Sequence, residues 1–410
     1  MQFNPFRPNN MAGPDMFVGR VPELLSIEKC LFQTKHGNPQ HFLIEGERGI
    51  GKSSLFLYVK SLAQGRFTGL DFKDKFKFIC VSVDLGKCKT QLHIIQNIAK
   101  GLKAEIAAKQ EIKAKATAFW GWITQWEVMG VKFNHEDDSF DADFAGQELV
   151  SNLTKFFDEV NDIDGVLILL DEADAPESSA DLGTFLKMTS ERLQRNDCNQ
   201  VVFGLAGLPP LLGRLKDSHE SSPRLFEIMT LATLEVDERR RVVNNSVERA
   251  NEANKTDLTI NDDAMDELCN ISEGYPHFLQ QFGYCAFEAN TDEVIDVGDV
   301  INGAFLTNGA IDQLGAKFFN DMYNARISSD DYRRVLDAMS IYSDGWIKRD
   351  VIRSDCGLAD HTITNALRSL LAKDIIIKDE SRKGFYRLPT KSFAVWINAT
   401  KRKSVDKPDA

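Results

Sequence analysis

A glycine-rich segment near the start of the chain ends in lysine and serine. Gly46 to Ser53 has the sequence GERGIGKS and matches the pattern G-x4-G-K-[ST], in which backbone N–H groups turn towards phosphate oxygens. Lys52 would reach the β- and γ-phosphates, and Ser53 would offer its hydroxyl to Mg²⁺. The predicted ligands are therefore ATP and Mg²⁺. The residues expected to contact the nucleotide here are Gly46, Glu47, Arg48, Gly49, Ile50, Gly51, Lys52, Ser53 and Ser54.

A second motif joins an apolar run to two carboxylates. Val166 to Leu170 is apolar at every position, as in a strand buried on both faces, and Asp171 and Glu172 follow it. An ATPase places such a strand beside its phosphate loop. We expect Asp171 to hold Mg²⁺ through its water and Glu172 to polarise the water that attacks the γ-phosphate. Acidic residues often end strands, so this motif alone is weak evidence for an ATPase. Its occurrence together with Lys52 of the phosphate loop is what favours the functional interpretation.

The elements around these motifs alternate between strands and helices. Strands are expected at His41–Glu45, Lys75–Asp84, Val166–Leu170 and Val201–Leu205, with helical patterns between them. The alternation predicts an α/β fold with a mainly parallel sheet. The phosphate loop would then join the first strand to the helix that follows it.

Composition restricts the class of protein. The 410 residues include 49 Lys and Arg against 61 Asp and Glu, a net charge of −12, which argues against a surface that coats nucleic acid throughout. The balance suits a globular protein of two or three domains. No apolar run reaches the ~18 residues that span a bilayer, and the N-terminus lacks an apolar signal segment. The seven scattered cysteines are typical of buried thiols in a reducing compartment, so we expect a cytoplasmic protein without a membrane partner.

The two motifs and the upstream segment Phe17 to Arg20 (FVGR) resemble those of the AAA+/STAND superfamily of P-loop ATPases. The chain looks most like archaeal origin-recognition-type ATPases and related bacterial STAND proteins. The resemblance implies a P-loop ASCE-type parallel sheet with a helical lid and a C-terminal winged helix. It also implies that Phe17, Val18 and Arg20 lie beside the adenine.

Further resemblances are local. Val201–Gly207 occupies the place of the family's sensor-1 strand, but Gly207 stands where a polar residue is common. Arg224 resembles an arginine that acts at a subunit boundary and would be catalytic; the alternative is a surface arginine in a turn. Pro276 and His277 resemble the nucleotide-sensing part of the lid, where relatives carry an arginine; the alternative is a helix-start turn.

The end of the chain has the pattern of a winged helix. Between Ser329 and Lys403 there are fifteen Lys and Arg against ten Asp and Glu, an asymmetry that favours nucleic-acid contact. The alternative is a protein-docking module. Helices are expected at Asp331–Tyr342, Ile347–Arg353 and Asp360–Lys373, and strands at Asp374–Asp379 and Gly384–Leu388. Candidate DNA contacts are Thr362, Thr364, Asn365, Arg368, Arg382 and Lys383.

Five segments follow from these patterns: an N-terminal arm (1–15), the ATPase core (16–234) with an aromatic insertion at about 116–145, a helical lid (235–327), a winged helix (328–403) and a tail (404–410). We expect residues 235–307 to be helical throughout. The insertion carries Trp120, Trp122 and Trp126. These tryptophans would either form a stacking or partner surface or fold on a small aromatic core of their own.

The combined patterns predict an ATP-hydrolysing molecular switch. It would form homo-oligomers with ATP and act on DNA or a protein effector through its winged helix. A slowly turning signalling scaffold for a separate effector, as in defence or transposition, is one alternative. A DNA-binding transcription regulator with a degenerate ATPase is another.

Overall fold

The computed structural model describes residues 2–130, 138–209, 211–342, 345–379 and 381–405. The chain forms two compact units, Met11–Ala232 and a second one that combines Met1–Asn10 with Thr233–Ala410. Each unit is described separately below. Residues 131–137 of the predicted insertion and 406–410 of the predicted tail lie outside the described residues.

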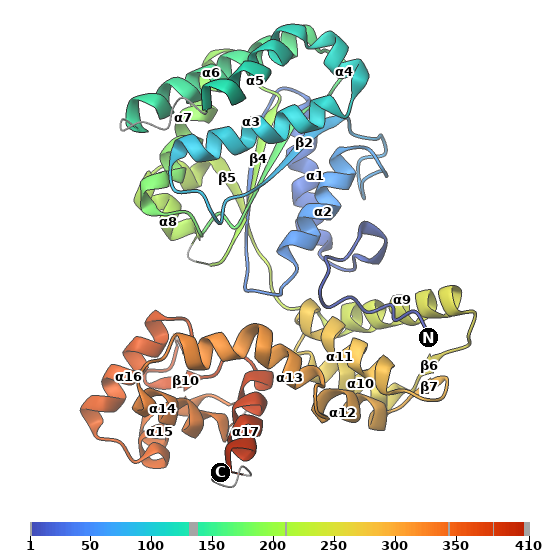
Figure 1. Cartoon of the computed structure of the whole chain (residues 1–410), viewed down its shortest axis with the longest axis vertical. Coiled ribbons are helices and arrows are strands. Elements are labelled where there is room, and N and C mark those ends of the chain that lie inside the picture. Colours follow the sequence, from blue (N-terminus) through green and yellow to red (C-terminus); the bar gives the residue numbers. More distant parts are fainter. Residues whose placement is uncertain (1, 131–137, 210, 343–344, 380, 406–410) are drawn as a thin grey trace. The chain divides into compact units, whose positions relative to one another are not determined.

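A five-stranded sheet forms the centre of the first unit (Figure 1), with all pairs parallel and the order β2–β3–β4–β1–β5. The predicted α/β class with a P-loop-type parallel sheet is confirmed. The acidic strand β3 lies in the same sheet as β1, with β4 between them. The strands are β1 (His41–Glu45), β2 (Phe78–Asp84), β3 (Gly165–Asp171), β4 (Val201–Gly207) and β5 (Phe226–Thr230).

Helices cover both faces of this sheet. The first two lie on one face, and α3, α5, α6 and α7 lie on the other (Figure 1). Short 3-10 turns occur at Pro14–Met16, Ser178–Ala180 and Ser222–Leu225. The helices are α1 (Val21–Lys35), α2 (Lys52–Ala63), α3 (Gln91–Ala107), α4 (Gln110–Lys115), α5 (Thr117–Gly130), α6 (Asp138–Glu159), α7 (Leu182–Arg195) and α8 (Leu211–Ser218).

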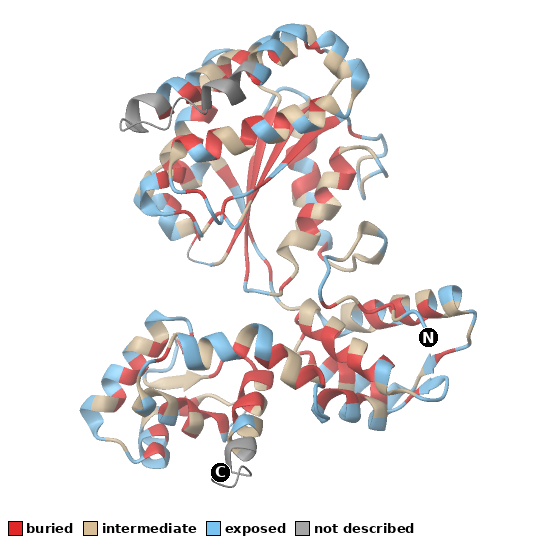
Figure 2. Ribbon diagram, in the orientation of Figure 1, coloured by how far each residue is buried: buried red, intermediate tan, exposed pale blue. Residues whose placement is uncertain are grey.

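The central strands of the sheet are buried, as their red colour in Figure 2 shows, whereas the edge strands β2 and β5 have exposed residues. Every residue of β1 and β4 is buried, since apolar side chains on both faces meet a helical layer. Gly204 in the middle of β4 leaves room for the ring of Phe42 on the adjacent strand. A Cβ at position 204 would overlap that ring, so this close packing requires glycine.

The aromatic insertion packs on the main core. Phe119 and Ile123 of α5 are buried in the same apolar cluster as Val81 and Ile168 of the sheet, so the prediction of a separate small core is wrong. Trp120 and Trp122 are half-buried against this cluster. Nothing is described of the Trp126 side chain.

The second unit begins with a helical part and ends with the C-terminal module. Two short strands, β6 (Thr259–Ile260) and β7 (Val294–Ile295), pair in parallel, so the expectation of a purely helical segment to 307 is wrong. The helices of the first part are α9 (Val236–Asn254), α10 (Asp262–Ile271), α11 (Pro276–Ala289), α12 (Val297–Phe305) and α13 (Ala310–Leu314), followed by π-helical turns at Gly315–Phe319 and Asp321–Ala325.

The C-terminal module has more strands than the sequence predicts. Residues 347–348 form a strand rather than the start of the second helix, and they make a three-stranded antiparallel sheet of order β8–β10–β9. A final helix was not predicted. The elements are α14 (Asp330–Ser340), β8 (Ile347–Lys348), α15 (Arg349–Cys356), α16 (Asp360–Ala372), β9 (Ile377–Lys378), β10 (Phe385–Arg387) and α17 (Lys391–Val405).

A half-buried glutamate connects this last helix to the rest of the unit. Both carboxylate oxygens of Glu273, in the turn before α11, accept backbone N–H groups at the start of α17, from Lys391 (2.8 Å) and Ser392 (2.9 Å). The carboxylate therefore satisfies N–H groups that have no partner within the helix.

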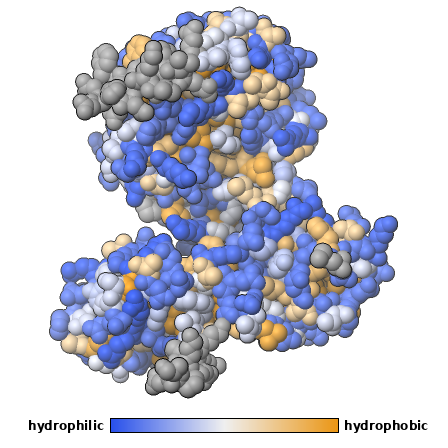
Figure 3. Space-filling model, viewed as in Figure 1, coloured by the Kyte–Doolittle hydropathy of each residue, from blue (hydrophilic) through white to orange (hydrophobic). Residues whose placement is uncertain are grey.

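The surface shows no extended apolar belt on the face drawn in Figure 3, where hydrophobic side chains form patches among hydrophilic ones. Within the described ranges, no helix is both long and apolar enough to cross a membrane. All seven cysteines are buried and unpaired.

We predict opposite effects for alanine at two glycines. Gly204→Ala should lower the free energy of unfolding by ~1–3 kcal/mol, because its Cβ must displace the Phe42 ring. Gly213→Ala on α8 is the control, since a Cβ there meets no atom within 4 Å; it should be neutral or stabilise by up to ~1 kcal/mol. Urea unfolding of the full chain measures both. Equal stability of the two variants would contradict this account of β4.

Candidate functional site

The phosphate loop joins β1 to α2 through residues in the left-handed backbone region. Gly49 has φ 77° and Gly51 has φ 103°, conformations that favour glycine. The Arg20 side chain is 7% exposed and donates a hydrogen bond from Nη2 to the carbonyl of Ile50 (3.2 Å). Arg20, which directly precedes α1, therefore stabilises the phosphate loop through this hydrogen bond. Arg20 was expected beside the adenine, and its hydrogen bond to Ile50 was not predicted.

Lys52 lies along the inside of the loop. Its Nζ donates hydrogen bonds to the carbonyls of Gly46 (2.6 Å) and Glu47 (2.9 Å). Burial lowers the pKa of this lysine, while the carboxylates of Asp171 and Asp174 act in the opposite direction. The ammonium group is therefore fixed between the loop carbonyls and the acidic end of the sheet.

Ser53 and Asp171 meet across the intervening strand β4. The Ser53 hydroxyl donates a hydrogen bond to Oδ2 of Asp171 at 2.9 Å. A hydroxyl and a carboxylate at this spacing are the oxygen ligands that Mg²⁺ prefers. The two residues predicted to hold the metal are thus brought together and fit that ion.

Glu172 follows in a strained conformation. Its φ is 52°, and its N–H donates to Oδ1 of Asp171 (2.9 Å). The side chain reaches over the loop after β2, where a Cβ on Gly86 would collide with its carboxylate. Desolvation raises the pKa of Glu172, and the nearby charges of Asp84 and Asp171 raise it further.

Two acidic residues of the site were missed by the sequence analysis. Asp84 ends β2 and lies opposite Asp171 in the strand register. Asp174 accepts a hydrogen bond from the N–H of Leu208 (2.8 Å), and a Cβ on Gly207 would come within 2.7 Å of its carboxylate. The Asp174 carboxylate thus fills the space that a side chain at 207 would need. The carboxyl ends of parallel strands meet at one edge of the sheet. Asp84 is the last residue of such a strand, so its position could have been predicted from the sequence.

Other predicted loop and adenine-side residues have varied surroundings. The ring of Phe17 packs on Tyr58 with centroids 5.1 Å apart. The Ser54 hydroxyl accepts a hydrogen bond from the N–H of Ala12 (3.1 Å), and Val18 is half-buried. Glu47 and Arg48 are exposed, whereas Ile50 is buried.

Three further predicted residues belong to elements other than the phosphate loop. Arg224 is exposed in the turn before β5. Pro276 begins α11 in the second unit, and His277 follows it with its ring against Phe318 at 4.8 Å. Desolvation, with a smaller effect of Lys317, lowers the pKa of His277 to about 4. The imidazole is therefore neutral at pH 7.

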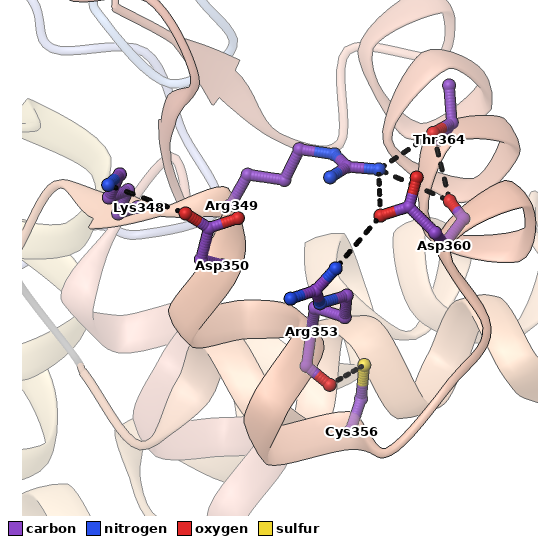
Figure 4. A network of polar contacts seen from close by, with 7 residues as sticks. All are labelled: Lys348, Arg349, Asp350, Arg353, Cys356, Asp360 and Thr364. Carbon is purple, nitrogen blue, oxygen red and sulfur yellow. Dashed lines mark hydrogen bonds and ion pairs between the residues drawn. The ribbon is translucent and has the colours of Figure 1, made fainter.

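The predicted nucleic-acid interface lies on α16 and the adjoining turn. His361, Thr364, Asn365 and Arg368 are exposed, and Thr362 is half-buried. Figure 4 shows Asp360 at the start of α16 between two arginines of α15, Arg349 at 2.9 Å and Arg353 at 3.3 Å. Arg349 also donates to the Thr364 hydroxyl (2.9 Å). One carboxylate thus offsets part of the positive charge of this face.

At the turn between β9 and β10, Lys383 is exposed and Arg382 is held in place. The Arg382 side chain hydrogen-bonds the Asp379 carboxylate (2.5 Å) and lies over the rings of Phe385 (4.8 Å) and Trp346 (5.8 Å). These contacts fix the guanidinium group at the tip of the module.

Comparison with known proteins agrees with this geometry. Residues 16–197 match the family model described as the AAA ATPase domain, a range that holds both the phosphate loop and the Asp171–Glu172 pair. Residues 16–197 are thus similar to an AAA ATPase domain. A curated relative, an uncharacterised HTH-type transcriptional regulator of Methanocaldococcus jannaschii, is 25% identical over 256 residues, which is 61% of this chain and 58% of that relative. The match thus spans little more than half of that protein.

Solved structures resemble the chain as a whole. A Walker-type ATPase of Pyrococcus abyssi has 14% identity and a TM-score of 0.60, covering 96% of this chain and 99% of that one. The ORC2 protein of Aeropyrum pernix, solved as ADPNP–ADP complexes, has 13% identity and a TM-score of 0.60, with 99% of both chains covered. At these identities the likeness concerns the fold. The predicted resemblance to AAA+ and archaeal origin-recognition-type ATPases is confirmed.

Proposed function

We propose that this protein binds ATP with Mg²⁺ and hydrolyses it to ADP and phosphate. The observation that carries the proposal is the meeting of Ser53 and Asp171 at 2.9 Å beside a glycine-rich loop that ends in Lys52. The AAA ATPase family match supports it. So does the Aeropyrum pernix ORC2 protein, a fold relative solved with ADPNP and ADP.

Each residue has a distinct role in this proposal. Loop N–H groups and the start of α2 bind phosphate oxygens, and Lys52 pairs with the β- and γ-phosphates. Ser53 and Asp171 would hold Mg²⁺, which supplies positive charge to the phosphate oxygens when bound. Glu172 takes a proton from the water that attacks the γ-phosphate. Arg224, exposed in its turn, would act on the nucleotide of a neighbouring copy in a homo-oligomer.

A second proposed activity is DNA contact through the C-terminal module. The order α14–β8–α15–α16–β9–β10 is that of a winged helix, with α16 in the position of the recognition helix. Exposed Asn365 and Arg368 on this helix support the assignment. The likeness to a protein named as an HTH-type transcriptional regulator also favours it.

A slow nucleotide-gated scaffold remains the rival to an active hydrolase. Both bind ATP, and they differ in whether Glu172 determines the rate of phosphate release. A transcription regulator with a degenerate ATPase would bind DNA equally with and without nucleotide. Phosphate release by Glu172→Gln separates the hydrolase from the scaffold, and DNA binding measured with and without ATP separates the regulator from both.

Glu172→Gln should retain ATP binding and lose about a hundredfold or more of the phosphate-release rate, because glutamine cannot accept the water's proton. Steady-state phosphate release and nucleotide binding measure the two effects. Glu220→Gln, on an exposed residue, is the matched control and should match the wild type. Equal rates for wild type and Glu172→Gln would remove Glu172 from the mechanism.

Asp84→Asn should shift the acidic limb of the pH–rate profile to lower pH. The Asp84 charge raises the pKa of Glu172, and a base works only when deprotonated, so removing that charge extends activity downwards in pH. The profile of kcat between about pH 5 and 8 tests this. An unchanged acidic limb would show that Asp84 does not act on the titrating group.

Asp360→Asn should strengthen DNA binding, because it frees Arg349 and Arg353 and removes one negative charge from the face of α16. Fluorescence anisotropy with duplex DNA at several salt concentrations measures the change. Asp374→Asn is the control: it removes the same charge from an exposed residue and should have a smaller effect. If the two variants bind alike, the arginines of α15 do not contact DNA.

A further inference from the structure

The helix α12 has its larger apolar side chains on the outside. Val300, Gly303 and Ala304 are buried, and a Cβ on Gly303 would come within 2.5 Å of the Cys285 backbone of α11. The small residues therefore pack against α11. Ile301 and Phe305, which are larger, are 38% and 54% exposed. This is the reverse of the usual amphipathic pattern.

These exposed side chains form one stripe. Five of the seventeen large hydrophobic side chains that are exposed in the described part of the chain lie between positions 294 and 306. Within α12, Val297, Ile301 and Phe305 recur every four residues and therefore lie on one helix face. Val294 in β7 and Leu306 just after the helix flank them. Single exposed apolar residues are common, but a contiguous group is typical of an interaction site. The members of this α12 stripe are Val294, Val297, Ile301, Phe305 and Leu306.

The stripe lies in a strongly acidic part of the sequence. Residues 256–316 contain twelve Asp and Glu and no Lys or Arg, as many negative charges as the net charge of the whole chain. Asp292 and Glu293, just before β7, and Asp296, at the N-cap of α12, are exposed. None of these three forms an ion pair with another described residue. Their charge is thus available to a partner.

These charges restrict what can cover the stripe. Nucleic acid and anionic membranes would be repelled by the carboxylates. Two copies paired α12 to α12 would bring carboxylates against carboxylates. A protein helix with apolar residues on one side and Lys or Arg beside them satisfies both the apolar and the charged groups.

We infer that α12 is a docking surface for a basic amphipathic helix of a partner protein. The apolar side of the partner would cover the α12 stripe, and its cations would pair with the carboxylates at 292, 293 and 296. The residues of this surface are different from those of the phosphate loop and of α16. The inference therefore holds whether or not the protein hydrolyses ATP.

The test uses the full chain without nucleotide and a fluorescent model peptide of leucine and lysine, patterned as an amphipathic helix. A peptide of the same composition with its leucines spread around the helix is the first control, and a leucine–glutamate helix is the second. We expect the leucine–lysine helix to bind by fluorescence anisotropy, more weakly at high salt. Both control peptides should bind at least about tenfold more weakly.

Variants locate the binding surface. The double variant Ile301→Ser, Phe305→Ser should weaken peptide binding about tenfold or more, and Glu293→Lys should weaken it several-fold. Ile341→Ser, at a residue 65% exposed in the C-terminal module, should leave binding unchanged. All these side chains are exposed, and circular dichroism checks that each variant is folded.

Three results would overturn the inference. Equal binding of the patterned and spread peptides, or equal binding of the peptide by wild type and the double variant, would show that α12 is not the docking surface. The third result comes from sedimentation velocity: a wild-type oligomer that the double variant dissociates would assign the stripe to a second copy of this chain.

Discussion

The candidate site depends on one constraint: two loops that leave different strands must meet across a third. Ser53 at the start of α2 hydrogen-bonds Asp171 at the end of β3, although β4 lies between β1 and β3. The contact requires all three strands to be parallel and to end at the same edge of the sheet. Gly204 allows β4 to pack closely between its neighbours, and Arg20 supports the loop through Ile50. The geometry of the site therefore depends on the packing of the core.

The sequence predicted those features that depend on local pattern. The loop from Gly46 to Ser53 has a fixed spacing, and the run from Val166 to Asp171 has the composition of a buried strand, so both could be placed without coordinates. Strand order could not be predicted in this way, because it depends on pairing between strands that lie far apart in the sequence, such as β1 and β4. Asp174 was missed because its role depends on Gly207, a residue 33 positions away that lies beside it only in the folded sheet.

The second unit shows where local pattern is weakest. The strands β6, β7 and β8 have two residues each, too few to produce a periodic signal. The helix α17 is stabilised at its start by Glu273, 118 residues before Lys391. No residue near Lys391 in the sequence therefore indicated where this helix begins. The outward stripe of α12 also escaped prediction, because apolar residues at helical spacing normally indicate the buried face.

The central claim is that the loop and the acidic strand together bind a magnesium nucleotide. Isothermal titration calorimetry of the folded wild-type chain with ATP, with and without Mg²⁺, tests it most directly. The account predicts one binding site per chain, tighter with magnesium, and loss of the magnesium effect in Asp171→Ala. Absence of ATP binding by the folded protein in the presence of magnesium would contradict it.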